Sequence, residues 1–458
     1  MQSKMIVRRT QYAVGQGGFH VGELHTNDKK FRYIYDCGSR NPSSINSILK
    51  SWPSDDKKFD WLVVSSFDSD HFNGVKLLLD NGFTFEVIVL PHLLDEELFR
   101  QIFFYYAARG VDGDEISTIA EVFHGILAGK FGRIVPTRLD ELPGELSKFN
   151  DAIDTKKLIL KSKGRVSEIS YRFSDADWML RFYSVEAVNK GVIEDIFNHP
   201  CLIPLRESIE SISKSLHAKI PFDELKKLIE TLNEKLSSRY KKPDVLPSAP
   251  DATPINKPDE NDVYVGKKLK EILGKECRPA GKRSVVYDYN SASLCLYSGP
   301  IPEPHENFNT NFNCNRTVNY QRLSNELPKV QESRVVGWIG VGDITFKDAD
   351  SLKDFIRHFS AEITLAGTRM LPHHGAQSNY DDNLSLLNSY AMIIPSGSMW
   401  VAAANPLGGY RHPDGSVVAG VRATGHFHLV DDEPQTTLQE VITYRPSLHP
   451  LIYELMSL

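Results

Sequence analysis

The chain has 458 residues, of which 41% are hydrophobic and 24% are charged. These proportions are typical of a globular protein that buries a large core. The formal net charge of -6 excludes a basic nucleic-acid footprint spread over the whole chain, although a local basic groove stays compatible with it.

Cysteine usage and hydropathy predict the compartment. The five cysteines are scattered and form no CxxC pair, which favours a reducing compartment over a disulfide scaffold. The N-terminal residues lack the apolar run of a signal peptide, and no stretch is apolar and long enough to span a bilayer. We therefore expect a cytoplasmic protein with no membrane partner.

Up to residue 90, strand-like and helix-like segments alternate. Short helices are expected at 43–52 and 75–79, with a polar loop at 66–73. Such alternation indicates a layered α/β architecture. The expected strands are 5–14, 31–35, 61–65 and 85–90.

The middle of the chain has a different character. Residues 95–131 are helical in pattern, and residues 190–283 form a charged helical insertion that includes a Pro-, Asp-, Asn- and Lys-rich linker at 241–262. A solvated helix face explains the charges of this insertion, and docking of a partner protein is the alternative. The remaining segments, 1–189 and 284–458, are predicted to form one domain. Its further strands are expected at 178–185, 293–297, 335–339, 391–395 and 417–421.

A polar loop follows the buried strand at 61–65. It places Asp68, Asp70 and His71 close together in the chain. Carboxylate with imidazole suits zinc, manganese or iron better than calcium or magnesium alone. Taken alone, an ordinary polar turn explains this loop equally well, because Asp and Ser are common in turns.

Two distant segments favour the metal interpretation. Asp343 ends the glycine-rich segment 340–343 after an apolar strand, and His373 with His374 follows another strand-like stretch. Three strand-end loops rich in ligand-type residues predict that these loops converge on a cation.

With these segments in place, the chain resembles the metallo-β-lactamase superfamily, and more narrowly the soluble hydrolase domain of DNA-uptake competence proteins. The similarity rests on a VGQG turn at 14–17, a D-x-G strand end at 36–38, the loop at 65–74, Gly-Asp at 342–343 and PHHG at 372–375. It covers roughly 5–90 and 284–430. It implies an αββα sandwich, with residues 190–283 as a helical insertion.

The resemblance also implies a ligand set. Asp70, His71, Asp343 and His374 would surround one metal, with Asp343 bridging to a second metal held by Asp68. Ser66 stands where the family has a histidine, so one or two divalent cations are expected, zinc or manganese. Asp70 could also orient the attacking water, and His373 could lie behind the ligands or touch substrate. His92, His124 and His199 are candidates for a further ligand by position only.

Four other polar positions could contact a substrate phosphate. Asn405, Arg411 and His412 resemble an N-x-x-x-H-P loop beside the family's active site, although a surface turn explains them equally well. Arg369 precedes the histidine pair, where a surface role is the alternative. His426 and His428 have metal-like spacing, but ordinary strand histidines are the preferred interpretation.

The resemblance favours a phosphodiesterase or nuclease that uses a metal-activated water and acts on nucleic acid or another phosphodiester. A hydrolase of a small ester or thioester is one alternative. Because of Ser66, a non-catalytic or weakly catalytic interaction module in a multi-protein system, such as antiviral defence, is another.

Overall fold

The computed structural model describes residues 5–91 apart from 27–28, and residues 335–445 apart from 348, 382–383 and 396. It also describes 133–136, 158–163, 166–173, 178–185, 293–302, 313–319, 330–332 and a few isolated positions between 122 and 227. The chain divides into two compact units, Met1–His92 with Arg133–Val185 and Asn290–Leu458, and Leu93–Gly132 with Glu186–Tyr289. The predicted insertion at 190–283 and linker at 241–262 lie almost wholly outside the described residues, as do the helical segment 95–131 and His92, His124 and His199.

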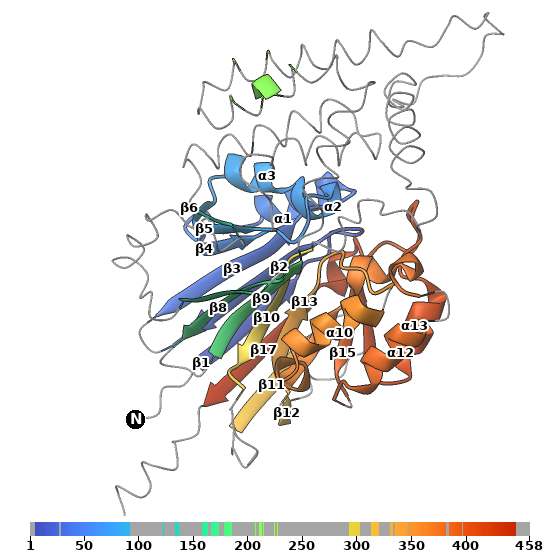
Figure 1. Cartoon of the computed structure of the whole chain (residues 1–458). Helices are drawn as coiled ribbons and strands as arrows, with labels where there is room; N and C mark the ends of the chain where they lie inside the picture. The colour runs from blue at the N-terminus through green and yellow to red at the C-terminus, as the bar shows by residue number, and fades with distance from the viewer. Residues whose placement is uncertain are drawn as a thin grey trace, which may run out of the picture. The chain divides into compact units, whose positions relative to one another are not determined.

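Two mixed sheets form the first unit, which confirms the α/β class (Figure 1). The first sheet has the order β12 (Val330–Glu332), β11 (Asn313–Asn319), β17 (Leu438–Arg445), β1 (Met5–Gln11), β2 (Phe19–His25), β3 (Lys30–Cys37), β4 (Lys58–Val63), β5 (Thr84–Leu90) and β6 (Arg133–Pro136). The second has the order β16 (His426–Val430), β15 (Met399–Ala403), β14 (Ala366–Met370), β13 (Gly337–Gly340), β10 (Cys295–Pro300), β9 (Trp178–Val185), β8 (Val166–Phe173) and β7 (Leu158–Lys163).

Each sheet is part antiparallel and part parallel. In the first sheet the ladder turns parallel from β3 to β6, and in the second it is parallel from β13 to β16. Parallel strands end at one edge of a sheet, so the loops that follow β3, β4, β13, β14 and β15 can meet there.

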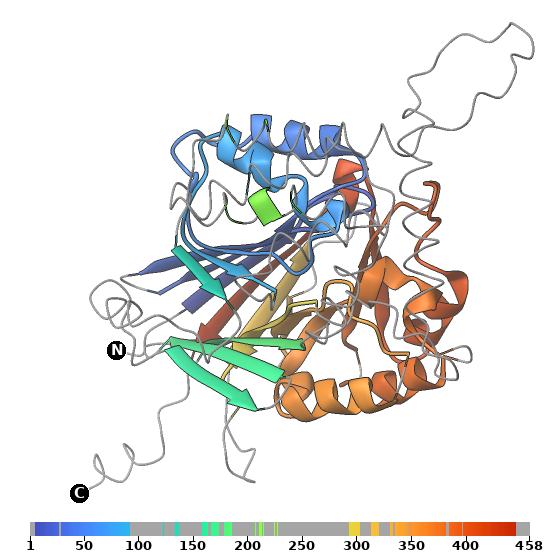
Figure 2. The same ribbon diagram turned by 45° about the horizontal axis from the view of Figure 1, so that its top comes forward.

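The hydrophobic core joins the sheets face to face. Side chains of β3 and β4, such as Tyr33 and Trp61, pack in one cluster with Leu180, Leu296 and Trp338 of the second sheet. Helices cover the outer faces (Figures 1 and 2). They are α1 (Pro42–Lys50), α2 (Ser69–Phe72) and α3 (Val75–Asp80) near the first sheet, and α10 (Ala349–His358), α11 (Glu362–Leu365), α12 (Ser385–Met392) and α13 (Gly415–Arg422) near the second, with 3-10 turns η6 (Pro372–Gly375), η7 (Gln377–Asn379) and η8 (Pro434–Thr436).

Sequence patterns placed most N-terminal elements correctly, but three predictions were wrong. Residues 391–395 and 417–421, predicted as strands, lie mainly in or just after α12 and in α13. Both segments are short apolar runs, which fit a buried strand and an amphipathic helix equally well. The loop predicted at 66–73 contains the one-turn helix α2.

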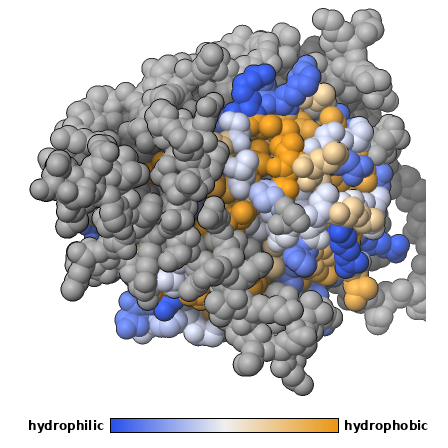
Figure 3. Space-filling model, turned by 90° about the horizontal axis from the view of Figure 1, so that it is seen from below, coloured by the Kyte–Doolittle hydropathy of each residue, from blue (hydrophilic) through white to orange (hydrophobic). Residues whose placement is uncertain are grey.

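The surface presents hydrophobic residues beside hydrophilic ones on the face drawn in Figure 3. Among the described residues, no helix is long and apolar enough to cross a membrane. Among the described residues, the exposed large hydrophobic side chains are Met392, Ile393, Leu407 and Tyr410.

Candidate metal centre

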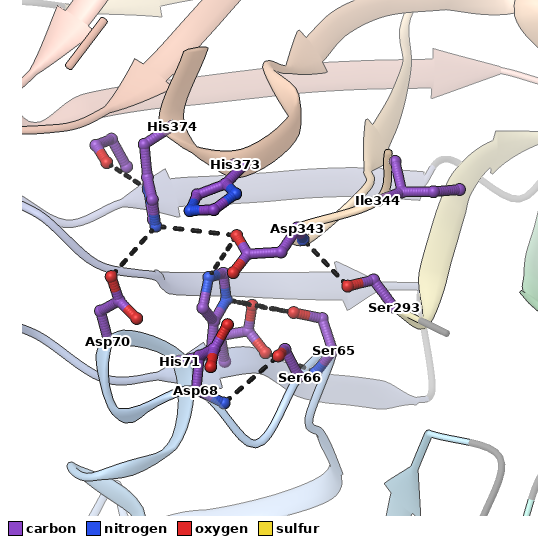
Figure 4. A network of polar contacts seen from close by, with 12 residues as sticks. Ser65, Ser66, Asp68, Asp70, His71, Ser293, Asp343, Ile344, His373 and His374 are labelled. Atoms are coloured by element: carbon purple, nitrogen blue, oxygen red, sulfur yellow. Dashed lines mark hydrogen bonds and ion pairs between the residues drawn. The ribbon is translucent and has the colours of Figure 1, made fainter. Parts of the chain in front are cut away.

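Three strand-end loops bring four polar side chains together (Figure 4). Asp70 and His71 lie on α2 after β4, Asp343 follows β13, and His374 lies in η6 after β14. Nε2 of His71 is 2.9 Å from Oδ1 of Asp343, across 272 positions of the chain. Nε2 of His374 is 3.5 Å from Oδ2 of Asp70 and 3.8 Å from Oδ1 of Asp343. These are the residues that the sequence predicted to converge.

The chemistry of this cluster fits a divalent cation. Asp70, His71 and His374 each offer a ligand atom, and these atoms lie within 4.8 Å of one another. All three residues are buried, as is Asp343. Nε2 of His374 is buried without a hydrogen-bond partner among the described residues, although two carboxylates lie near it. Two imidazoles and two carboxylates are a donor set suited to zinc or manganese.

The rear nitrogen of each histidine is held by the fold. Nδ1 of His71 lies 2.7 Å from Oδ2 of Asp36, and Asp36 in turn accepts hydrogen bonds from the backbone N and the Oγ of Ser65, each at 2.6 Å. Nδ1 of His374 lies 2.7 Å from the carbonyl oxygen of Ala403, at the end of β15. These contacts direct both Nε2 atoms into the cluster, as in metal sites whose histidines bond to a carboxylate or a carbonyl behind them.

Replacing Asp36 with asparagine is expected to weaken metal binding by about 10- to 100-fold, because such outer partners fix the ring orientation and raise the basicity of the ligand. Competition with a chromophoric chelator measures the affinity. Asp350→Asn, an exposed change on α10, is the matched control and should bind like the wild type. Equal affinities in all three proteins would contradict the role of Asp36.

Close backbone contacts fix the ligand loop against the end of β3. Gly38 leaves no room for a side chain, because a Cβ there would lie 2.4 Å from the carbonyl carbon of Asp70 and from the backbone N of His71. Ser39 and Asn73 exchange hydrogen bonds, from Ser39 N to Asn73 Oδ1 at 3.0 Å and from Asn73 Nδ2 to Ser39 O at 2.8 Å. The loop is therefore positioned before any cation binds.

Gly38→Ala is expected to destabilise the protein by about 1–3 kcal/mol or more, because overpacking against rigid backbone forces the main chain to shift. Urea denaturation followed by tryptophan fluorescence measures the loss. Gly415→Ala is the control, since a Cβ at that position meets nothing within 4 Å. A Gly38→Ala protein as stable as this control would disprove the close packing of the loop.

The electrostatics of the cluster favour the charged forms of Asp70, Asp343 and His71. Burial raises the pKa of Asp70 and of Asp343, but neighbouring histidines outweigh it, so the pKa of each carboxyl is held below its ordinary value. Burial lowers the pKa of His71, yet Asp343 and Asp36 raise it well above the ordinary value overall. A proton on Nε2 of His71 and a cation would therefore compete for the same position.

The two other predicted metal ligands lie differently. Asp68 is buried, and its backbone N donates to Oγ of Ser66 at 3.2 Å; it is not one of the three residues, Asp70, His71 and His374, whose ligand atoms lie within 4.8 Å of one another. His373 lies beside Asp343 (Figure 4), and its Nδ1 is 2.8 Å from Oδ1 of Asn379. Asn379 also donates to the carbonyl oxygen of Asp343 at 2.9 Å. His373 is therefore linked through Asn379 to the backbone of Asp343.

Backbone conformation at the histidine pair is unusual. His373 and His374 have φ values of 45° and 58°, in the left-handed region that non-glycine residues rarely adopt. Such strain is concentrated at functional sites, where the surrounding structure holds it. Here the left-handed backbone places the imidazole rings of two adjacent residues, His373 and His374, near Asp343.

The residues predicted to contact substrate lie in different places in the structure. His412 lies beside the cluster, with its ring centroid 6.0 Å from that of His373. Asn405 accepts a hydrogen bond from Leu407 N at 3.0 Å, which shapes the turn. The prediction for Arg369 was wrong: this side chain is buried, and its Nη2 donates to the carbonyl oxygen of Ile363, within the packing of the second sheet. His428 is also buried, with Nε2 2.9 Å from Thr436 O, whereas His426 is exposed.

Sequence reasoning missed several residues that build this centre. Asp36 was noted only as part of a motif, although its place at the end of β3 and before a glycine was a usable signal. Ser293 Oγ accepts a hydrogen bond from Asp343 N at 3.1 Å, and Asn379 joins His373 to Asp343. No motif marked Asn379, because its role depends on the turn geometry of η7.

Comparison of the chain with protein-family models gives no match, and comparison with curated proteins gives none either.

Proposed function

We propose that this chain is a metal-dependent hydrolase of the metallo-β-lactamase fold that cleaves phosphodiesters, most simply those of nucleic acid. The observation that carries the proposal is the convergence of Asp70, His71, Asp343 and His374 from three separate loops. The motif order resembling competence-protein hydrolase domains, and the two helix-flanked sheets, support the same fold.

A divalent cation in this centre would lower the pKa of a bound water and polarise the phosphorus–oxygen bond. Asp70 would accept a hydrogen bond from the attacking water and orient it. Because neighbouring charges hold the pKa of Asp70 low, its carboxylate stays ionised and is better suited to orienting the water than to keeping its proton. In the reaction, a bond would form between the water oxygen and phosphorus, the bond to the leaving oxygen would break, and the proton released by the water would pass through solvent to the leaving oxygen.

Cysteine chemistry supports a reducing compartment for this hydrolase. Cys37 and Cys295 are buried free thiols, and free thiols are typical of reducing compartments. Residues of the cluster need no disulfide to hold them, because hydrogen bonds and close backbone packing do so. We place the enzyme in the cytoplasm on this ground.

The experiment tests purified protein with Mn²⁺ or Zn²⁺ on labelled single- and double-stranded DNA and RNA. Bis(p-nitrophenyl) phosphate and p-nitrophenyl acetate complete the panel as a diester and a neutral ester. We expect cleavage of at least one diester that is lost in His374→Ala and kept in His426→Ala, an exposed histidine of β16. Hydrolysis of the acetate alone would replace the proposal by an esterase, and equal cleavage by His374→Ala would remove it.

Ser66 favours one second candidate, a non-catalytic interaction module that keeps the scaffold. The buried Ser66 hydroxyl accepts a hydrogen bond from Asp68 N and supplies no imidazole. Metal analysis separates the two candidates, because a module would retain less than about half an equivalent of transition metal after gentle purification, whereas the hydrolase binds it tightly.

A further inference from the structure

Arg40 lies at the edge of the cluster. It follows β3 and precedes α1, and its Nε is 3.4 Å from Oδ2 of Asp70. Its side chain is 39% exposed, so one side of the guanidinium faces the buried carboxylate and the other faces solvent. Among the described residues, no hydrogen bond or ion pair involves its terminal nitrogens Nη1 and Nη2. Within the part of the chain that the structure describes, Nη1 and Nη2 are therefore open to an anion.

The backbone that carries Arg40 is fixed. Its N donates to the carbonyl oxygen of Gln16 at 2.8 Å. The preceding Ser39 is bound to Asn73, at the end of the ligand loop, and its Oγ donates to Val14 O at 2.5 Å. A charged group on such a base is presented to the site with little reorganisation, which is the condition for strong electrostatic stabilisation.

An aromatic side chain covers the guanidinium. The Cζ of Arg40 lies 5.2 Å from the ring centroid of Tyr410, within the range of a cation–π contact. Tyr410 is 58% exposed and is stacked on His412, with 6.1 Å between the ring centroids. Arg40, Tyr410 and His412 thus form a wall along one side of the cluster, from Asp70 to His373.

The side of the centre formed by Asp70 and Asp68 carries negative charge, which a positively charged group can balance. The guanidinium of Arg40 is positively charged at neutral pH and lies 3.4 Å, at Nε, from the buried carboxylate of Asp70. Ser66, whose hydroxyl is bound by Asp68 N, supplies no imidazole here for a second metal. The guanidinium of Arg40 can provide positive charge on this side of the centre, next to Asp70.

The geometry points to Arg40 as a substrate-binding residue that holds the non-bridging oxygens of an anionic phosphoryl group through Nη1 and Nη2. This inference rests on the proposed function and deepens it, because it selects anionic phosphoesters over neutral esters. Arginine suits the role, since its planar fork matches a phosphate in a bidentate contact, whereas lysine offers a point charge.

The test measures binding of inorganic phosphate to metal-loaded protein by calorimetry. We expect the Kd of Arg40→Ala to rise by about 10- to 100-fold, as for loss of a hydrogen bond to a charged group, and that of Arg40→Lys to rise less. All variants are compared at saturating metal, because Arg40 contacts the ligand Asp70, and metal stoichiometry should stay at the wild-type value. Arg357→Ala, which removes an exposed guanidinium from α10, is the control and should bind phosphate like the wild type.

Kinetics give a second measurement. For Arg40→Ala we expect kcat/KM on bis(p-nitrophenyl) phosphate to fall by about 100-fold, with any p-nitrophenyl acetate hydrolysis changed by no more than about twofold. A wild type that binds no phosphate, an unchanged phosphate Kd in Arg40→Ala, or a loss explained wholly by weaker metal binding would overturn the inference. Arginine-dependent phosphate binding without any diester cleavage would instead retain Arg40 as an anion site and remove the proposed function.

Discussion

A protein with asparagine in place of Asp343 is expected to lose both its metal and its hydrolytic activity. Asp343 is 1% exposed and lies within 3.8 Å of the Nε2 atoms of both His71 and His374. Asparagine keeps the size of the side chain but removes the negative charge that a cation needs. The loss of metal affinity should exceed the roughly 10- to 100-fold expected for an outer partner such as Asp36.

Metal content after gentle purification, with chelator competition for the affinity, measures this effect. Asp350→Asn makes the same chemical change on α10, at a side chain that is 91% exposed to solvent. This variant should retain wild-type metal content. If Asp343→Asn keeps a full equivalent and full activity, the convergence of the three loops is not a metal centre.

Removing the metal is expected to lower the stability of the unit that contains the centre. A ligand that binds only the folded state stabilises it by about 4 kcal/mol when its free concentration is a thousand times its Kd. We therefore expect the thermal midpoint to rise when Mn²⁺ or Zn²⁺ is added and to return when it is chelated. His374→Ala should show no rise, whereas His426→Ala should behave like the wild type.

The size of this metal effect should grow as the pH rises. In the metal-free protein the pKa of His71 is raised above its ordinary value, so its charge stabilises the fold fully below the unfolded pKa of about 6.5. That contribution is lost as the pH rises through the folded pKa. Metal and proton compete for the same Nε2 atom, so metal binding strengthens over the same range. Thermal scans with metal and with chelator from pH 6 upward check this, and a gap that narrows with pH would contradict it.

The sequence contained enough information for the ligands because these residues follow apolar strands. Asp70 and Asp343 come after β4 and β13, whose buried runs are recognisable as strands, and strand ends at one edge of a sheet converge. The resemblance to a known motif order then selected His374. The geometry agrees with the expected group of four.

Other parts of the site depend on packing that no local pattern encodes. Arg40 was not predicted, because its role follows from Asp70 and Tyr410, which are distant in the chain. Arg369 was misplaced, since its position before the histidine pair gave no information on which face of β14 it occupies. The strand predicted at 417–421 is part of α13, where Val417 and Val421 share one buried face, a spacing that five residues cannot distinguish from a strand run.

The position of β17 has a consequence for synthesis. This strand pairs with β1 along Met5–Gln11 and with β11 on its other side, so β1 leaves the ribosome more than 400 residues before this partner. Meanwhile the edge of β1 stays unpaired, and such edges invite aggregation. His374 also emerges long after Asp70, so the proposed ligand set is incomplete until His374 has been synthesised, and overexpression should benefit from chaperones and from slow growth at low temperature.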